Sequence, residues 1–460
     1  MKIKKYYSSS EVLTSSKEIL RYTVYLLGSR WLWVSASFLG TYFMGKLGHF
    51  QLAAGALINV TLLMILLTAA AMLYSINVTV SKTHARDEFE ETGKIFQQAF
   101  LLAAILGILV LLFIWVIPPI LLLVKEEPKV VMHVKQFFYG YAPGLVFLLW
   151  YSAFLQLYTS IEKFKAVIYL NIFYVLLVAF LGEALAFGKW GFPNLGMKGI
   201  GLAFSIAFII VFLIAIGYLI FHKDFHKYHF FKIPDHFTYY YLRKLFMIGW
   251  PIGLQLGGEF VAYSFAVIVL GWFGANTLAA QQIVMQLNSF LLMAPLAISV
   301  AASIVIARSL GLEKYKEPFL HGNTSIFIGF LFWIVILIIY FVFPDQICSL
   351  FLRGDSQVNK EITVIARHFF YVFAIVFFFD SIRNILTGAL RGFHDTKMPA
   401  VIGTVAAWVS IPIGMFLAYF LHMGPIGIQL GFIVGLGLGA LLIQKRFWKK
   451  AFPLIEKDQA

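Results

Sequence analysis

Two acidic side chains, Glu259 and Asp380, stand inside long apolar stretches of this 460-residue sequence. Glu259 comes 15 residues after Lys244, which is about 22 Å along a helix at 1.5 Å per residue. Asp380 lies several helical turns from both Arg367 and Arg391. An ionised carboxylate in hydrocarbon is costly, so such residues are expected to bind ions or protons. The pair is therefore the first candidate for a site that exchanges H⁺ or Na⁺; the alternative is that both merely pair with neighbouring groups.

Polar side chains accompany Glu259 on the same stretch and on the next one. Gln255 precedes Glu259 by four residues, so the two share a helix face. Gln282, Gln286 and Asn288 add polar groups to the following stretch. These side chains are candidates for a substrate cavity, but polar groups also bind helices together in lipid, and both roles stay open.

Two arginines also fall inside apolar stretches. Arg383 follows Asp380 by three residues, so it can neutralise that carboxylate or form a salt bridge that switches. Arg30 has only serine or tyrosine neighbours nearby in the sequence. Because an unpaired buried arginine is expensive, we expect Arg30 to pair with Glu183; contact with an anionic group on a substrate is the alternative.

Lipid must be the main solvent for the elements that position these side chains. Hydrophobic residues make up 61% of the sequence and charged residues only 13%, which is too few charges for a water-soluble protein of this length. A span needs about 20 apolar residues, and such stretches recur along the whole chain. The sequence predicts an all-α membrane protein with spans at 17–43, 50–78, 96–121, 136–157, 165–187, 197–221, 243–271, 278–307, 323–343, 361–389, 398–421 and 425–445. The first is expected to be a retained helix rather than a cleaved signal.

The distribution of basic residues predicts the orientation of these spans. With the N-terminus in the cytoplasm, about 25 of the 36 Lys and Arg residues fall on the cytoplasmic side, as the positive-inside rule requires. Both termini are therefore expected in the cytoplasm of a bacterium, with the spans in its inner membrane. This bias and anionic lipids account for the net charge of +14, so no nucleic-acid partner is needed. We expect a monomer in contact with membrane lipids, and the single Cys348 excludes an internal disulfide.

One sequence unit is used twice. Gly196–Phe204 and Gly424–Phe432 share the pattern G-x-x-G-I-x-L-x-F at a displacement of 228 residues. Two weaker matches have nearly the same displacement: Leu52-Ala-Ala with Leu278-Ala-Ala, and Phe137-Phe-Tyr with Phe369-Phe-Tyr. Duplication of this kind is common in transporters and predicts two six-helix lobes related by a pseudo-two-fold axis, with a binding cavity between them. The predicted parts are an N-terminal lobe at 1–221, a cytoplasmic linker at 222–242, a C-terminal lobe at 243–446 and a cytoplasmic tail at 447–460.

The linker carries four histidines, of which His222 and His226 have the i, i+4 spacing of a metal-binding pair. Aromatic and basic residues interleave through 229–232, as expected of a segment on the membrane surface. The surface segment is the favoured interpretation. No metal is predicted beyond a possible Na⁺ at Glu259 and Asp380, and no cofactor beyond the coupling ion.

The chain resembles the multidrug and toxic compound extrusion (MATE) family, in its bacterial NorM-like branch. The resemblance covers nearly all of the chain and is strongest in the second half. It rests on Gly249-Trp-Pro251 through Glu259, Leu278-Ala-Ala-Gln-Gln282, Ala307-Arg-Ser-Leu-Gly311, Asp380, Gly388-Ala-Leu-Arg391-Gly-Phe-His-Asp395-Thr-Lys, and in the first half Gly188-Lys-Trp-Gly-Phe-Pro193 and Gly196–Phe204.

This resemblance implies two lobes that open alternately to each side and that export organic compounds as Na⁺ or H⁺ enters. It also assigns Glu259 and Asp380 to the cation site of the C-terminal lobe. The chain departs from the family where an acid is expected in the first helix, because Gly40 stands there. Val178 and Gly182 replace two expected asparagines, and Val376 an expected tyrosine. The departures predict that coupling is confined to the C-terminal lobe.

Other function classes fit less well. Gly188-Lys189 lacks the spacing of a phosphate-binding loop and is followed by Trp190, so no ATP site is predicted. An enzyme is not expected, because no histidine or other metal-ligating residue lies near Glu259 or Asp380 within their predicted helices. The rivals are a lipid-linked sugar flippase and an exporter of an anionic metabolite, although a flippase cavity needs more basic residues than the two arginines present in the spans. We predict multidrug efflux of small organic compounds, mainly cations, by exchange.

Overall fold

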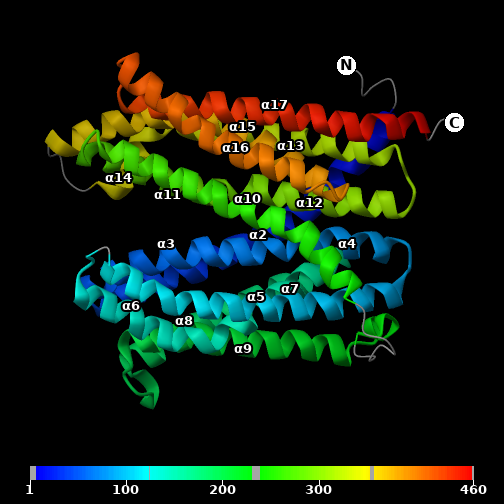
Figure 1. Cartoon of the computed structure of the whole chain (residues 1–460), viewed down its shortest axis with the longest axis horizontal. Helices are drawn as coiled ribbons and strands as arrows, with labels where there is room; N and C mark the ends of the chain where they lie inside the picture. The colour runs from blue at the N-terminus through cyan, green and yellow to red at the C-terminus, as the bar shows by residue number, and fades with distance from the viewer. Residues whose placement is uncertain (1–6, 124, 231–238, 353–356, 458–460) are drawn as a thin grey trace. The chain divides into compact units, whose positions relative to one another are not determined.

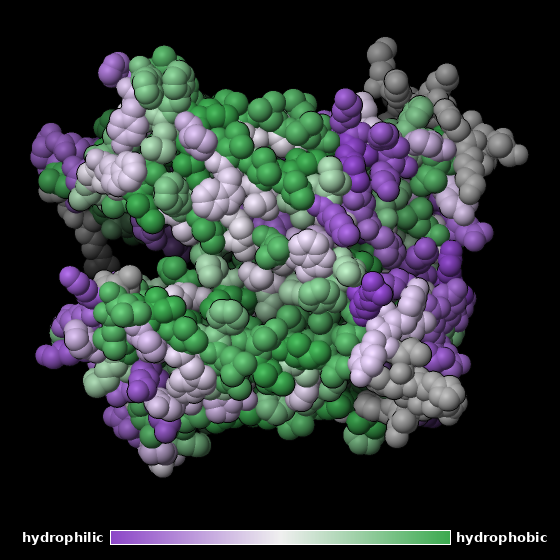
Figure 2. Space-filling view, viewed as in Figure 1, coloured by the Kyte–Doolittle hydropathy of each residue, from purple (hydrophilic) through white to green (hydrophobic). Residues whose placement is uncertain are grey.

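The computed structural model describes residues 7–123, 125–230, 239–352 and 357–457. Within these ranges the chain is helical apart from turns and short connections, and it contains no strand (Figure 1). Hydrophobic side chains cover the middle of the helices, and hydrophilic ones gather toward the helix ends (Figure 2). This is the pattern expected of helices whose central turns face hydrocarbon.

Eleven segments among the described residues are long and apolar enough to span a membrane. The first helix, α2 (Ser9–Leu47), has 39 residues and also has the length to span, but it is more polar than the others. With α2 included, the structure confirms the all-helical fold and the twelve predicted spans. Several spans are built from two consecutive helices, such as α3 and α4, which meet at Leu73.

The chain divides into two compact units. The first unit runs from Gly28 to Gly253. The second contains the chain up to Leu27 and everything from Leu254 onward. Both changes of unit fall inside continuous helices, α2 and α10 (Tyr240–Gly271).

In the first unit, α9 packs against α6, α7 and α8, while α5 packs against α7. Its helices are α3 (His49–Met72), α4 (Tyr74–Ala85), α5 (Phe89–Leu123), α6 (Pro128–Tyr141), α7 (Leu145–Ser160), α8 (Phe164–Phe187) and α9 (Gly196–Phe221), with the short turns η1 (Ala142–Gly144), η2 (Lys189–Gly191) and η3 (Lys223–Tyr228).

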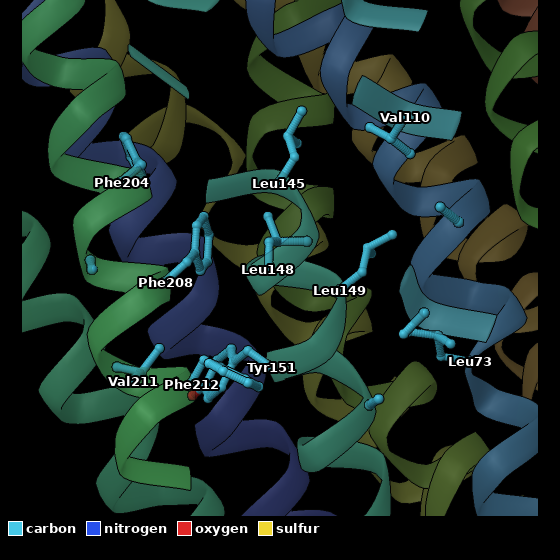
Figure 3. Packing of buried hydrophobic residues seen from close by; sticks show 14 of the residues in the cluster. Leu73, Val110, Leu145, Leu148, Leu149, Tyr151, Phe204, Phe208, Val211 and Phe212 are labelled. Atoms are coloured by element: carbon cyan, nitrogen blue, oxygen red, sulfur yellow. The ribbon is translucent and has the colours of Figure 1, made fainter. Parts of the chain in front are cut away.

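Aromatic side chains fill the core of the first unit. Trp150 of α7 stacks on Phe100 of α5 with 4.6 Å between ring centroids, and on Phe212 of α9 with 5.3 Å. Other apolar side chains of α7 and α9, including Leu148 and Phe208, lie in the same cluster (Figure 3). Lipid offers helices no hydrophobic driving force for association, so close ring packing of this kind holds them together.

In the second unit, α15 packs against α11, α12, α13 and α17, and α16 packs against α17. Its helices are α10, α11 (Ala275–Leu291), α12 (Met293–Gly311), α13 (Glu317–Val342), α14 (Pro344–Phe351), α15 (Gln357–Gly392), α16 (Lys397–Met415) and α17 (Pro425–Lys457), with the π-turn η4 at Phe416–Phe420. Glycines allow the closest approach, because a Cβ on Gly388 of α15 would collide with the backbone carbonyl oxygen of Ser299 on α12.

The start of α2 is bonded to the second unit. The hydroxyl of Ser15 lies 2.8 Å from Nδ1 of His321 on α13. Arg308, near the end of α12, donates to Glu18 at 2.8 Å. Both contacts join residues near the beginning of the chain to residues about 300 positions later. The first turns of α2 therefore depend for their packing on segments far along the chain.

The described part of the linker follows the end of α9 and folds against the first unit. Tyr228 bonds His84 at 3.0 Å, and Gln97 donates to the carbonyl of Phe230 at 2.9 Å. His222 precedes the 3₁₀ helix η3 and His226 lies inside it, and in a 3₁₀ helix residues four apart do not share a face. No group of three or more metal-ligating side chains occurs among the described residues. Lys232 and His236 of the linker lie outside them.

Candidate cation site

Glu259 and Asp380 come from two helices of the second unit and meet around one arginine. Glu259 lies on α10 and Asp380 on α15, with 5% and 8% of their surfaces exposed. Arg383, one turn after Asp380 on α15, is 1% exposed. Its guanidinium lies between the two carboxylates and pairs with both. This structure therefore shows the arrangement given above as the alternative to an ion site, in which both acids pair with a neighbouring group.

The guanidinium of Arg383 makes four hydrogen bonds to the two acids. Nη1 donates to Oε1 of Glu259 at 2.5 Å, and Nη2 to Oε2 at 2.9 Å. Nε and Nη2 donate to Oδ1 of Asp380 at 3.2 and 2.6 Å. The contact with Glu259 is the two-pronged arrangement that suits a planar guanidinium and a carboxylate. It binds α10 to α15 across 124 positions of sequence.

A second arginine extends the cluster. Gln255 donates from Nε2 to Oε1 of Glu259 at 2.9 Å, and its own carbonyl oxygen accepts from Arg391 at 3.1 Å. The predicted i, i+4 partnership of Gln255 and Glu259 is therefore present, with Arg391 beyond it. Two carboxylates, two guanidiniums and one amide therefore form a single buried cluster (Gln255, Glu259, Asp380, Arg383 and Arg391, hereafter the charge cluster).

Helix α16 closes over the charge cluster at a glycine. A Cβ on Gly403 would lie 2.6 Å from Oε1 of Glu259, 2.7 Å from Nε2 of Gln255 and 2.8 Å from Nη1 of Arg383. Only a residue without a side chain allows α16 to pass at this distance. Nothing in the sequence marks Gly403, because a glycine within an apolar span has many possible reasons. Tyr263, one turn beyond Glu259 on α10, also lies beside the cluster.

The other polar candidates of the second unit lie apart from the charge cluster. Gln282 and Gln286 are exposed on α11, and Asn288 is partly buried with its side-chain oxygen unpaired among the described residues. No hydrogen bond of the described residues joins these three to Glu259 or Asp380. The neighbouring Gln281 is buried instead, and it accepts from Gln429 of α17 at 2.6 Å.

The predicted pairing of Arg30 with Glu183 is wrong. Glu183 accepts from Lys46 at 3.2 Å and from Lys189 at 2.7 Å. Lys46 lies 16 residues after Arg30 on α2, about 24 Å along the helix. Arg30 donates instead to the hydroxyl of Tyr74 at 3.2 Å, and no carboxylate of the described residues pairs with it. The signal in the sequence was that Lys46 lies in the last turn of its helix and that Lys189 follows Glu183 by only six residues.

Comparison with known proteins gives the family. The family model MatE matches residues 26–183 and 251–416. The chain belongs to the MatE family. The two matched segments fall in the two halves of the duplication, and Glu259, Asp380 and Arg383 all lie in the second.

Several similar proteins are described as multidrug resistance proteins. A probable multidrug resistance protein NorM of Synechocystis sp. is 26% identical over 440 residues, with 94% of each chain covered. One from Pseudomonas aeruginosa is 27% identical, with 96% of this chain and 91% of the relative covered. This MatE chain is therefore a multi-pass membrane protein of a multidrug efflux family.

Solved structures agree on the fold. A MATE protein in the bent conformation superposes with a TM-score of 0.87 at 13% identity, covering 99% of this chain and 100% of the other. The Vibrio cholerae MATE transporter VcmN in its bent form gives a TM-score of 0.83 at 17% identity, covering 98% and 99%. At such identities the match concerns the fold of the MatE chain, and the site must be argued from its own residues.

Proposed function

We propose that this MatE chain is a secondary active transporter that exports organic compounds, mainly cations, in exchange for Na⁺ or H⁺ by alternating access. The observation that carries the proposal is the meeting of two buried carboxylates from α10 and α15 around one guanidinium. Buried charges on separate helices are expensive, and in membrane proteins they mark the paths of ions. Membership of a multidrug efflux family supports the exported class of compound.

The charge cluster supplies the parts that exchange requires. A cation that binds Glu259 or Asp380 competes with Arg383 for the same oxygens, and it thereby weakens the link between α10 and α15. Release of the cation restores the link. Because removing one partner from a buried ion pair costs about 3–5 kcal/mol, occupation of the carboxylates is strongly coupled to how these helices pack.

The absence of an acidic side chain at Gly40 supports the proposal that ion coupling is confined to the charge cluster of the second unit. A Cβ at position 40 would lie 3.0 Å from the ring of Phe204 on α9. The place where relatives are expected to carry an acid is therefore filled by an aromatic side chain in this chain. No second carboxylate pair of comparable burial occurs among the described residues of the first unit.

The test is efflux of a cationic dye from proteoliposomes under separately imposed Na⁺ and pH gradients. We expect Glu259→Gln and Asp380→Asn to reduce gradient-driven efflux at least about tenfold, since each removes one of the two buried carboxylates that pair with Arg383. Asp345→Asn is the matched control, because Asp345 pairs with Arg367 on the exposed surface. Full gradient-driven efflux by both cluster variants at normal expression would refute the assignment.

Export of an anionic compound is a second candidate, favoured by Arg30. This arginine stands in the middle of α2, where an uncompensated charge is costly, and its partner is the neutral hydroxyl of Tyr74. A carboxylate or phosphate on a transported compound would neutralise it. A lipid-linked sugar flippase is less well supported, because the guanidinium of Arg383 is already engaged by two acids.

Matched anionic and cationic dyes distinguish the two candidates. If anions are exported, Arg30→Gln should abolish transport of the anionic dye and spare the cationic one. Arg21→Gln, at an exposed position of the same helix, should change neither. Equal loss of both dyes would show that Arg30 does not select for charge.

We propose that the chain lies in the inner membrane as a monomer with both termini in the cytoplasm. Cys348 is the only cysteine in the sequence and is buried, so a cysteine-free background requires a single substitution. Single cysteines placed at Lys189 and Lys227 should then react with a membrane-impermeant thiol reagent from opposite sides. Labelling of both from the same side would contradict this topology.

A further inference from the structure

We propose that Arg383 is a tethered cation that takes the place of Na⁺ at the carboxylate pair. While its guanidinium is engaged, Glu259 and Asp380 do not form a Na⁺ site. The inference rests on the proposed role of these two acids as the coupling carboxylates, and it adds that they exclude Na⁺ while Arg383 is engaged. It follows from three properties of the charge cluster: occupied oxygens, a positive charge already in place and closed space.

The oxygens that would face a metal ion are already used. A hard cation needs several oxygen ligands directed at one point. Both carboxylate oxygens of Glu259 accept from Arg383, at 2.5 and 2.9 Å, and Oδ1 of Asp380 accepts two further hydrogen bonds. Oε1 of Glu259 also accepts from Gln255. The shared centre of the two acids is therefore held by nitrogen donors.

The charges of the cluster are also satisfied without a metal ion. Arg383 forms ion pairs with both Glu259 and Asp380, so an added Na⁺ would lie against a guanidinium of the same sign in a buried site. Charge interactions are strong in such surroundings. Arginine keeps its proton under all conditions that proteins experience, so Arg383 cannot vacate the pair by becoming neutral, as a lysine can.

Space at the cluster is closed by α16. Arg383 is 1% exposed, and the position of a Cβ on Gly403 is only 2.8 Å from its Nη1. A Cβ on Gly439 of α17 would lie 3.5 Å from the Cδ of Arg383. The guanidinium thus fills the site between α10, α15, α16 and α17, and a metal ion can enter only if it leaves.

The two acids hold Arg383 in different ways. Asp380 is three residues away on the same helix, so these two side chains move together. Glu259 belongs to α10, so a separation of α10 from α15 breaks its two hydrogen bonds and leaves the pair on α15 intact. Glu259 is accordingly the carboxylate that movement can release, while Asp380 keeps Arg383 in place.

Binding of ²²Na⁺ to the purified full-length protein in detergent tests the inference. We expect no saturable binding by the unmodified protein. Arg383→Gln should give saturable binding with an affinity for Na⁺ at least about tenfold above that of the unmodified protein, equivalent to about 1.4 kcal/mol, and adding Glu259→Gln should remove the gain. Arg367→Gln is the matched control, because Arg367 is an ion-paired arginine on the same helix but lies at the surface.

The result that overturns the inference does not require the Arg383 variant to fold. Saturable ²²Na⁺ binding by the unmodified protein that disappears in Asp380→Asn would show that the acids accept Na⁺ beside Arg383. Failure of a folded Arg383→Gln protein to gain binding would also overturn it. The proposed function fails separately, if Glu259→Gln and Asp380→Asn retain full gradient-driven efflux.

Discussion

Replacement of Gly403 by alanine should destabilise the protein through the charge cluster. The added methyl carbon would lie 2.6 Å from Oε1 of Glu259, which is about 0.8 Å closer than an ordinary contact of 3.4 Å. The nearest atoms are the ends of long side chains. Such ends can usually move away from a new methyl group at little cost in free energy. Here Oε1 is bonded to Arg383 at 2.5 Å and to Gln255 at 2.9 Å, so the shift breaks or stretches these bonds.

The size of the effect follows from two opposing terms. Loss of one hydrogen bond to a charged group costs about 1.5–3 kcal/mol. Alanine in place of glycine in a helix interior stabilises the helix by about 0.8–1 kcal/mol. We therefore expect Gly403→Ala to lower the free energy of unfolding by about 1–2 kcal/mol. Gly437→Ala on α17 is the control of opposite sign, because its Cβ would meet nothing closer than 3.7 Å.

The assay is reversible unfolding in mixed micelles with increasing SDS, followed by far-ultraviolet circular dichroism. Gly403→Ala should unfold at lower SDS than the unmodified protein, and Gly437→Ala at the same or higher SDS. Combining Gly403→Ala with Arg383→Gln should give less than the sum of the two losses, since both act on the same bonds. Equal stability of the two glycine variants would refute the reasoning.

Three further predictions concern other contacts. Gln429→Leu should lower the free energy of unfolding by about 1–2 kcal/mol because it leaves the buried Gln281 unpaired, and Gln281→Leu with Gln429→Leu should recover part of this in the same SDS titration. Gly388→Ala should prevent accumulation of folded protein, measured by fluorescence-detected gel filtration, whereas Gly217→Ala, whose Cβ meets nothing within 4 Å, should accumulate normally. Glu183→Gln should change dye efflux by less than about twofold, because exposed ion pairs contribute little; a large loss would return Glu183 to the transport site.

Much of the fold could be predicted from sequence because membrane spans are local features. A run of about 20 apolar residues can be recognised as a span from its own sequence, without knowing which helices pack against it. The predicted spans accordingly lie on the helices of the structure. Local spacing also placed Arg383 beside Asp380 and Gln255 beside Glu259, since both pairs lie one turn apart on a helix.

Contacts between helices could not be predicted in the same way. The bond from Arg383 to Glu259 joins α15 to α10, and nothing in either segment states which turns face each other. For the same reason Gly403 was missed and Glu183 was assigned the wrong partner. Glu183 lies near the end of its span, at the level of Lys46, whereas Arg30 lies in mid-span. Matching residues by their depth in the membrane, rather than by charge alone, would have favoured Lys46.

The division of α2 between two units has a consequence for biogenesis. His321 and Arg308, which bond to Ser15 and Glu18 in its first turns, are synthesised about 300 residues later. The first turns of α2 must therefore remain without these partners until the segments that carry His321 and Arg308 have been made. A chain cut after Gly253 would separate the first turns of α2 from His321 and Arg308, the residues that they bond.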